Sequence, residues 1–94
     1  MISDTIVELA SIYGRVNCSP VRNGKYLLEI NGKAALLFNE TFVWSICHSN
    51  CANAYQFNGK NFHSHDFNPD REYLLGLINM AFKQIQMTGV KNAA

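Results

Sequence analysis

The chain has 94 residues, of which 48% are hydrophobic and 16% charged, and its formal net charge is +1. This length predicts a single domain over residues 1–94, because two separate cores would not fit, and the apolar content excludes a disordered chain. The near-neutral charge disfavours both a dedicated duplex-DNA binder and a strongly acidic DNA mimic.

The cysteines and the first residues bear on the cellular compartment. The three cysteines are Cys18, Cys47 and Cys51, and an odd number without a secretion signal favours a reducing setting. Residues 1–5 lack the basic start and apolar block of such a signal. No apolar run approaches the length of a membrane span. We therefore expect a cytoplasmic protein with no membrane partner.

A short helix at residues 5–13 is the first element that the sequence predicts. Thr5 and Glu8 have the spacing of a capping box, in which each side chain bonds the other residue's backbone N–H. Gly14 is a natural end for this helix. One apolar stripe at helical spacing consists of Ile6, Leu9, Ala10 and Tyr13.

The middle of the chain, residues 22–62, has the pattern of an antiparallel β-meander. The tripeptide Asn-Gly-Lys occurs there three times, starting at Asn23, Asn31 and Asn58. Asn-Gly between apolar runs is typical of a two-residue type I′ hairpin, in which both central residues need a positive φ. The strands expected from alternation are residues 25–30, 33–38, 42–48, 52–57 and 60–65.

Two of these segments carry additional information. Residues 15–21 are ambiguous, and Pro20 would confine them to an edge strand because it donates no ladder hydrogen bond. Residues 33–38 are apolar on both faces, as expected for a central strand that is covered on both sides or lies in an interface.

A second helix is expected near the C-terminus. Asn68 is the predicted N-cap and Pro69 the first helical residue. The helix should run to about Thr88 and end at Gly89, with a frayed tail at residues 90–94. A one-sided sheet must bury its apolar face, and the two helices are the available cover. The predicted fold is therefore α+β, an antiparallel meander of four to six strands with both helices on one face, forming a two-layer sandwich.

One cluster of residues has the chemistry of a zinc site. Cys47, Cys51, His63 and His65 are good Zn²⁺ ligands. A two-residue turn at Asn58 puts His63 and His65 on one face, opposite Tyr55 and Phe62, and Cys47 lies on the same side as the histidines. The alternative is two buried or half-buried cysteines beside two surface histidines, because the chain has enough apolar residues to fold without metal.

The same residues allow a Cys–His nucleophile pair built on Cys47 or Cys51. No catalytic signature surrounds them, and His48 is adjacent to Cys47, so on a strand it points to the other face. We therefore expect a protein that is not an enzyme, with a small Cys-dependent enzyme as an alternative.

Basic residues are expected to gather at one end of the meander. Alternate turns of a meander lie at the same end, which would bring Arg22, Lys25 and Lys60 together around Glu40. This cluster is a candidate partner-binding patch. Its alternative role is solubility, since lysines at strand ends discourage unwanted strand pairing. The aromatic residues that alternate with polar ones, and are therefore core candidates rather than base-stacking platforms, are Tyr55, Phe57 and Phe62.

The function predicted from these observations is binding without catalysis. The expected partner is another protein or protein complex, and a phage or mobile-element inhibitor of a bacterial enzyme or defence complex is one version of this prediction. The alternative is a zinc-stabilised nucleic-acid-binding module. A homodimer formed through a sheet face or edge is a further option.

Overall fold

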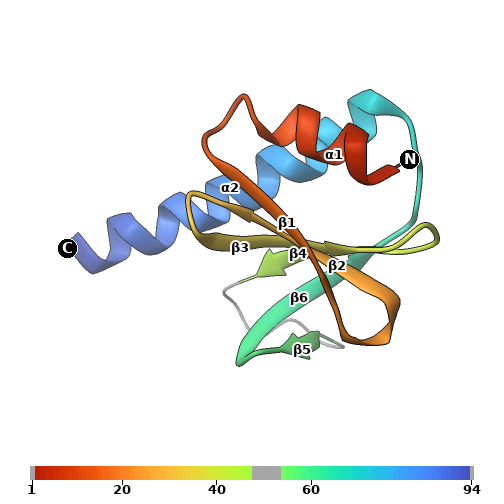
Figure 1. The fold of residues 1–94 in the computed structure, drawn as a ribbon. Coiled ribbons are helices and arrows are strands. Elements are labelled where there is room, and N and C mark those ends of the chain that lie inside the picture. The colour runs from red at the N-terminus through yellow and green to blue at the C-terminus, as the bar shows by residue number, and fades with distance from the viewer. Residues whose placement is uncertain (1, 48–53, 94) are drawn as a thin grey trace.

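The computed structural model describes residues 2–47 and 54–93, with side chains described up to residue 86. This part of the chain forms an α+β fold with an antiparallel sheet and two helices, as the sequence predicts (Figure 1). The elements in chain order are α1 (Ile2–Ala10), β1 (Val16–Val21), a 3-10 turn (Arg22–Gly24), β2 (Lys25–Ile30), β3 (Lys33–Phe38), β4 (Val43–Cys47), β5 (Tyr55–Phe57), β6 (Lys60–His65) and α2 (Arg71–Ala93).

The strand order in the sheet is β1-β2-β3-β4-β6-β5. Strands β1 to β4 follow each other as a meander, and the last hairpin joins the sheet through β6 rather than β5. The three-residue β5 therefore lies at the outer edge, where short strands limit unwanted pairing. At the other edge lies β1, which contains Pro20 as expected for an edge strand.

The Asn-Gly turns take the backbone conformation that the sequence predicts. Two of them are two-residue turns, since Ile30 pairs with Lys33 and Phe57 with Lys60. All six Asn and Gly residues of the three copies have a positive φ. The first turn differs in length, because Val21 pairs with Lys25 and three residues, Arg22–Gly24, lie between them.

Both ends of α1 differ from the prediction of residues 5–13. The helix begins at Ile2 and ends at Ala10, so Thr5 lies inside it and the predicted capping box is wrong. After the last turn, the Ser11 N–H and hydroxyl donate to the carbonyl oxygens of Val7 and Glu8. Of the predicted apolar stripe, the buried members are Ile6, Leu9 and Ala10.

Both ends of α2 also differ from the prediction. The carboxylate of Asp70 accepts the N–H of Tyr73 at 3.2 Å and so caps the helix, while Asn68, two residues earlier, accepts the N–H of Asp70. At the other end the helix continues through Gly89 to Ala93, because one glycine costs a helix about 1 kcal/mol without ending it. Across the described residues, neither helix has the length and apolar character needed to cross a membrane.

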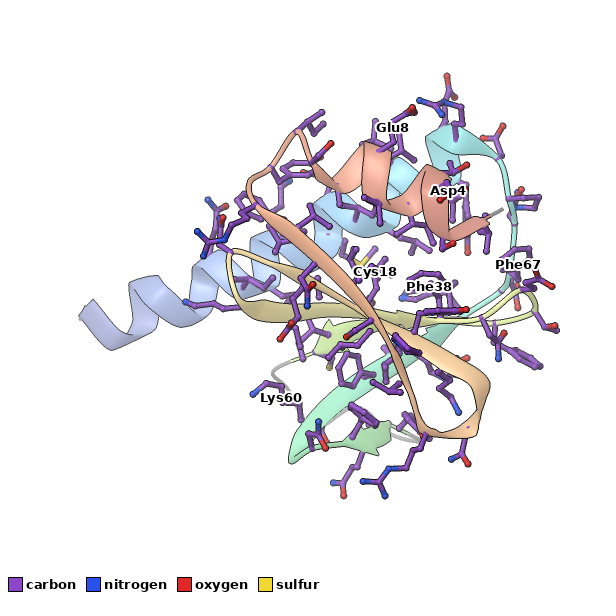
Figure 2. All side chains as sticks on the ribbon, in the orientation of Figure 1. Asp4, Glu8, Cys18, Phe38, Lys60 and Phe67 are labelled. Atoms are coloured by element: carbon purple, nitrogen blue, oxygen red, sulfur yellow. The ribbon has the colours of Figure 1, made fainter. Side chains whose placement is uncertain are left out.

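The two helices cover one face of the sheet. α1 packs on β1 and β2, and α2 packs on β3 and β4. Cys18 and Phe38 lie in the layer between sheet and helices, whereas Glu8 lies on the outer side of α1 (Figure 2). There Glu8 forms an ion pair of 2.8 Å with Arg71 at the start of α2. The buried sheet residues of this face include Leu28, Leu36, Phe38 and Val43.

The sheet curls strongly away from the helices. The ammonium nitrogen of Lys25, on β2, lies 5.0 Å from the ring centre of Tyr55, on β5. In a flat sheet these strands would be four spacings apart, about 19 Å, which is too far for two side chains to bridge. A register shift at Leu28/Glu29 contributes to the curvature, because bulges bend a strand and increase its twist.

The concave face of the curled sheet forms a second apolar layer. Phe62 and Leu37 are fully buried there although neither of the two described helices covers this face. Phe62 pairs across the strands with Ile46, and its ring meets the Phe57 ring edge-on, with the ring centres 6.5 Å apart. The curl thus allows strands β2 to β6 to bury their second apolar face against each other, which explains the two apolar faces of residues 33–38.

Candidate functional site

Three aromatic side chains form a continuous strip at the open end of the concave face. The ring centres of Phe42 and Trp44 are 5.8 Å apart, and those of Trp44 and Tyr55 are 5.7 Å apart. Phe42 is 50% exposed, and Trp44 and Tyr55 are half-buried. Phe42 and Trp44 share a side because they are two residues apart on extended backbone. We call Phe42, Trp44 and Tyr55 the aromatic strip.

Lys25 lies against this strip. Its ammonium nitrogen is 5.1 Å from the Trp44 ring and 5.0 Å from the Tyr55 ring, so it interacts with both π faces. No ion pair involves Lys25 among the residues described. The two rings and the lysine hold each other in place, which lowers the side-chain entropy that binding would otherwise cost.

The predicted basic cluster does not form. Lys25 and the Arg22 turn lie at one end of the sheet, whereas Lys60 lies at the other, the same end as Lys33. The reason is the position of the last hairpin. Because β6 lies next to β4, Cys47 pairs with Asn61, and the Asn58 turn lies at the same end of the sheet as the Asn31 turn. The prediction that Lys60 joins Arg22 and Lys25 is therefore wrong, and a partner-binding role for each stays a prediction.

The two histidines of the predicted zinc site do lie together. The ring centres of His63 and His65 are 5.1 Å apart. His65 Nε2 is 2.7 Å from the hydroxyl of Ser45, which is only 2% exposed. This hydrogen bond satisfies a buried polar group. Because Ser45 is buried, its hydroxyl is not positioned to meet a substrate.

The structure describes one of the two cysteines of the predicted zinc site, Cys47. Cys47 lies on the histidine side of the sheet, as expected, but is disulfide-bonded, and in that form it offers no thiolate to a metal. Cys51 lies outside the described residues. Within the described ranges no three His, Cys, Asp or Glu residues form a metal-binding group. The four-ligand zinc site stays a prediction. Cys18 is a free thiol whose pKa is raised by burial, as in a core cysteine.

His65 should make the stability of the fold depend on pH. Burial lowers the pKa of its imidazole, the nearby His63 lowers it further, and Asp66 opposes both. The unfolded chain therefore takes up a proton at about pH 6.5, before the folded protein does. Stability is complete above this pH and falls as the pH drops toward the folded-state pKa.

This dependence can be measured by thermal melts at pH 7.5 and 5.5. We expect the wild type to lose more Tm between these values than His65→Gln, which keeps a side chain that can hydrogen-bond Ser45 but cannot be protonated. Equal losses in both proteins would contradict the assignment to His65.

Comparisons with known proteins identify no relative of this chain. No family model, curated protein or solved structure gives a significant match to this chain. The site must therefore be interpreted from its own geometry.

Sequence reasoning missed the aromatic strip as a unit. The alternation of Phe42 and Trp44 with the buried Val43 indicates that the two rings share a face, and this part was available from the sequence. Tyr55 and Lys25 join them only through the curl of the sheet, which no local pattern reports. Of the aromatic residues predicted to be core, Phe57 and Phe62 are buried, and Tyr55 is half-buried.

Proposed function

We propose that this chain is a non-catalytic binding domain that acts by attaching the aromatic strip to the surface of another protein. The observation that carries the proposal is the half-exposed Phe42 continuous with Trp44 and Tyr55. Aromatic residues are enriched at the energetic centre of protein interfaces, with Trp and Tyr foremost among them. Among the described exposed large hydrophobic residues, Ile12, Phe42 and Met80, Phe42 is the aromatic one, and its ring lies beside that of Trp44.

The charge around the strip favours a protein over a nucleic acid. Lys25 is held against two rings, Arg22 is exposed nearby, and Glu40 brings a negative charge to the same end of the sheet. Nucleic-acid binding draws most of its affinity from several cationic contacts to phosphates. One or two cations beside a carboxylate are a weak basis for such binding, whereas a mixed polar rim around aromatic residues is typical of protein interfaces.

The test compares the strip with a matched exposed apolar residue. The wild type, Trp44→Ala, Phe42→Ala and Ile12→Ala are immobilised and exposed to extract from cells that make the protein, and each captured protein is then purified and titrated. We expect a partner whose affinity falls about 30-fold or more with Trp44→Ala, as for a central interface residue. Phe42→Ala should weaken binding less, and Ile12→Ala should leave it unchanged.

The variant Phe42→Ala guards against a folding artefact, because its side chain is half-exposed and little core is lost. A partner that binds all four proteins equally would contradict the proposal. Captured material that disappears after nuclease treatment would contradict it as well and would favour the nucleic-acid alternative.

A further inference from the structure

The end of the sheet opposite the aromatic strip carries a hollow of about 700 Å³. It lies between two hairpin turns, the β2–β3 turn at Gly32 and the β5–β6 turn at Gly59. Its volume is within the range of about 300–1,000 Å³ that is usual for small-molecule sites. Among the described residues that line it, none belongs to the aromatic strip, so the hollow is separate from the proposed protein interface.

The floor of the hollow is apolar. Its lining includes Leu27, Ile46, Phe57 and Phe62, which belong to the concave face of the sheet. Ile46, Phe57 and Phe62 are buried, and Leu27 is half-buried. Of these four side chains Leu27 keeps the most exposed surface, and a hydrocarbon or aromatic body placed against it would exclude water from that surface.

The rim of the hollow carries two lysines that come from the repeated tripeptide. Lys33 and Lys60 each follow an Asn-Gly turn as the first residue of a strand, and both line the hollow. Both side chains are exposed, and no ion pair involves either of them among the residues described. They share this end of the sheet because β6, rather than β5, pairs with β4, which places the Asn31 and Asn58 turns at the same end.

The remaining charge does not cancel the two lysines. Glu29 also lines the hollow, and its carboxylate accepts a hydrogen bond of 3.2 Å from the Asn17 amide on β1. The charged groups around the hollow thus sum to one excess positive charge, with two ammonium groups on the rim. Ammonium groups bind carboxylate and phosphate oxygens through short, charge-assisted hydrogen bonds.

We propose that this hollow binds an organic anion with an apolar body, whose carboxylate or phosphate group lies between Lys33 and Lys60 while the body rests on the floor against Leu27. In this proposal the Asn31 and Asn58 turns share one role, because each places a lysine on the rim of the hollow, although the two turns are far apart in the sequence. The third copy does not take part, because Lys25 lies at the other end against the aromatic strip.

The probes for the test are decanoate and decyl phosphate, with decyltrimethylammonium as a cation of the same chain length, all below their micellar concentrations. The ¹⁵N-labelled protein is titrated with each, and the backbone amide resonances of its glycines report the location. We expect saturable shifts at Gly32 and Gly59 with at least one of the two anions, and no matching shifts at Gly24 or Gly76. The tighter of the two anions identifies the headgroup.

The charge requirement is tested with a matched pair of double variants. Lys33→Ala/Lys60→Ala should weaken anion binding at least tenfold, while Arg22→Ala/Lys83→Ala, which removes two exposed charges that do not line the hollow, should bind as the wild type does. All four residues are exposed, so both variants should keep the dispersed spectrum of the folded protein. Binding of neither anion, equal binding of the cation, shifts centred on Gly24, or wild-type binding by the Lys33/Lys60 variant would overturn the proposal.

Discussion

Replacing Phe62 by alanine is expected to lower the free energy of unfolding by about 3–5 kcal/mol. Phe62 is fully buried on the concave face, between Ile46 on the neighbouring strand and the edge-on ring of Phe57. The surrounding sheet cannot collapse into the space of a lost ring, so a cavity remains and adds to the lost burial. The loss approaches the whole stability of a small domain, about 5–15 kcal/mol.

The measurement is urea unfolding followed by the fluorescence of Trp44, the single tryptophan, with Phe42→Ala as the control. Phe42 is also aromatic and also on the concave side but is half-exposed, so its removal should cost about 1 kcal/mol or less. A midpoint that moves equally in both variants would mean that the face without helices is not a core.

The expected difference between these two phenylalanines shows how far the sequence can be interpreted. Alternation along residues 55–62 correctly predicts that Phe57 and Phe62 face inward, because the two faces of a strand are a local property. The positive φ values of the Asn-Gly turns are equally local. The curl of the sheet depends instead on contacts between distant strands, such as Lys25 with Tyr55, and has no local pattern.

The order of the last two strands is the main feature that the sequence did not predict. A hairpin is antiparallel whichever of its strands joins the sheet, and the Asn58 turn contains no information about which one pairs with β4. Phe62 pairs with Ile46, and β6 has six residues against three in β5, so the longer strand takes the interior position. This choice separates Lys60 from Arg22 and Lys25 and brings it to Lys33.

The helix ends were mispredicted for a different reason. Thr5 and Glu8 match a capping pattern, yet the helix begins three residues earlier, because Ile2 also packs against the core. Asp70 caps α2 in place of Asn68, two residues away, and both side chains accept backbone N–H groups there. Tertiary packing and competing caps thus decide positions that local patterns fix only to within a few residues.

Gly14→Ala is expected to destabilise the fold by about 2–4 kcal/mol, the sum of backbone strain and a damaged hydrogen-bond pair. Gly14 has φ +156°, and an added Cβ would lie 2.5 Å from the Asn31 side-chain amide. That amide oxygen accepts the N–H of Arg15 at 2.9 Å, while the Asn31 N–H donates to the Arg15 carbonyl at 2.7 Å. The methyl group would push Asn31 away and release the link between the α1–β1 connection and the β2–β3 turn.

The matched control for this variant is Gly76→Ala, which adds the same methyl group within α2. Nothing lies within 4 Å of the new Cβ at Gly76, and alanine is favoured over glycine inside a helix by about 0.5–1 kcal/mol. Urea unfolding should therefore show opposite shifts in the two proteins, with a lower midpoint for Gly14→Ala and a higher one for Gly76→Ala. An unchanged midpoint for Gly14→Ala would mean that Asn31 can move at little cost, and that the turn carrying Lys33 is not fixed by its bonds to Arg15.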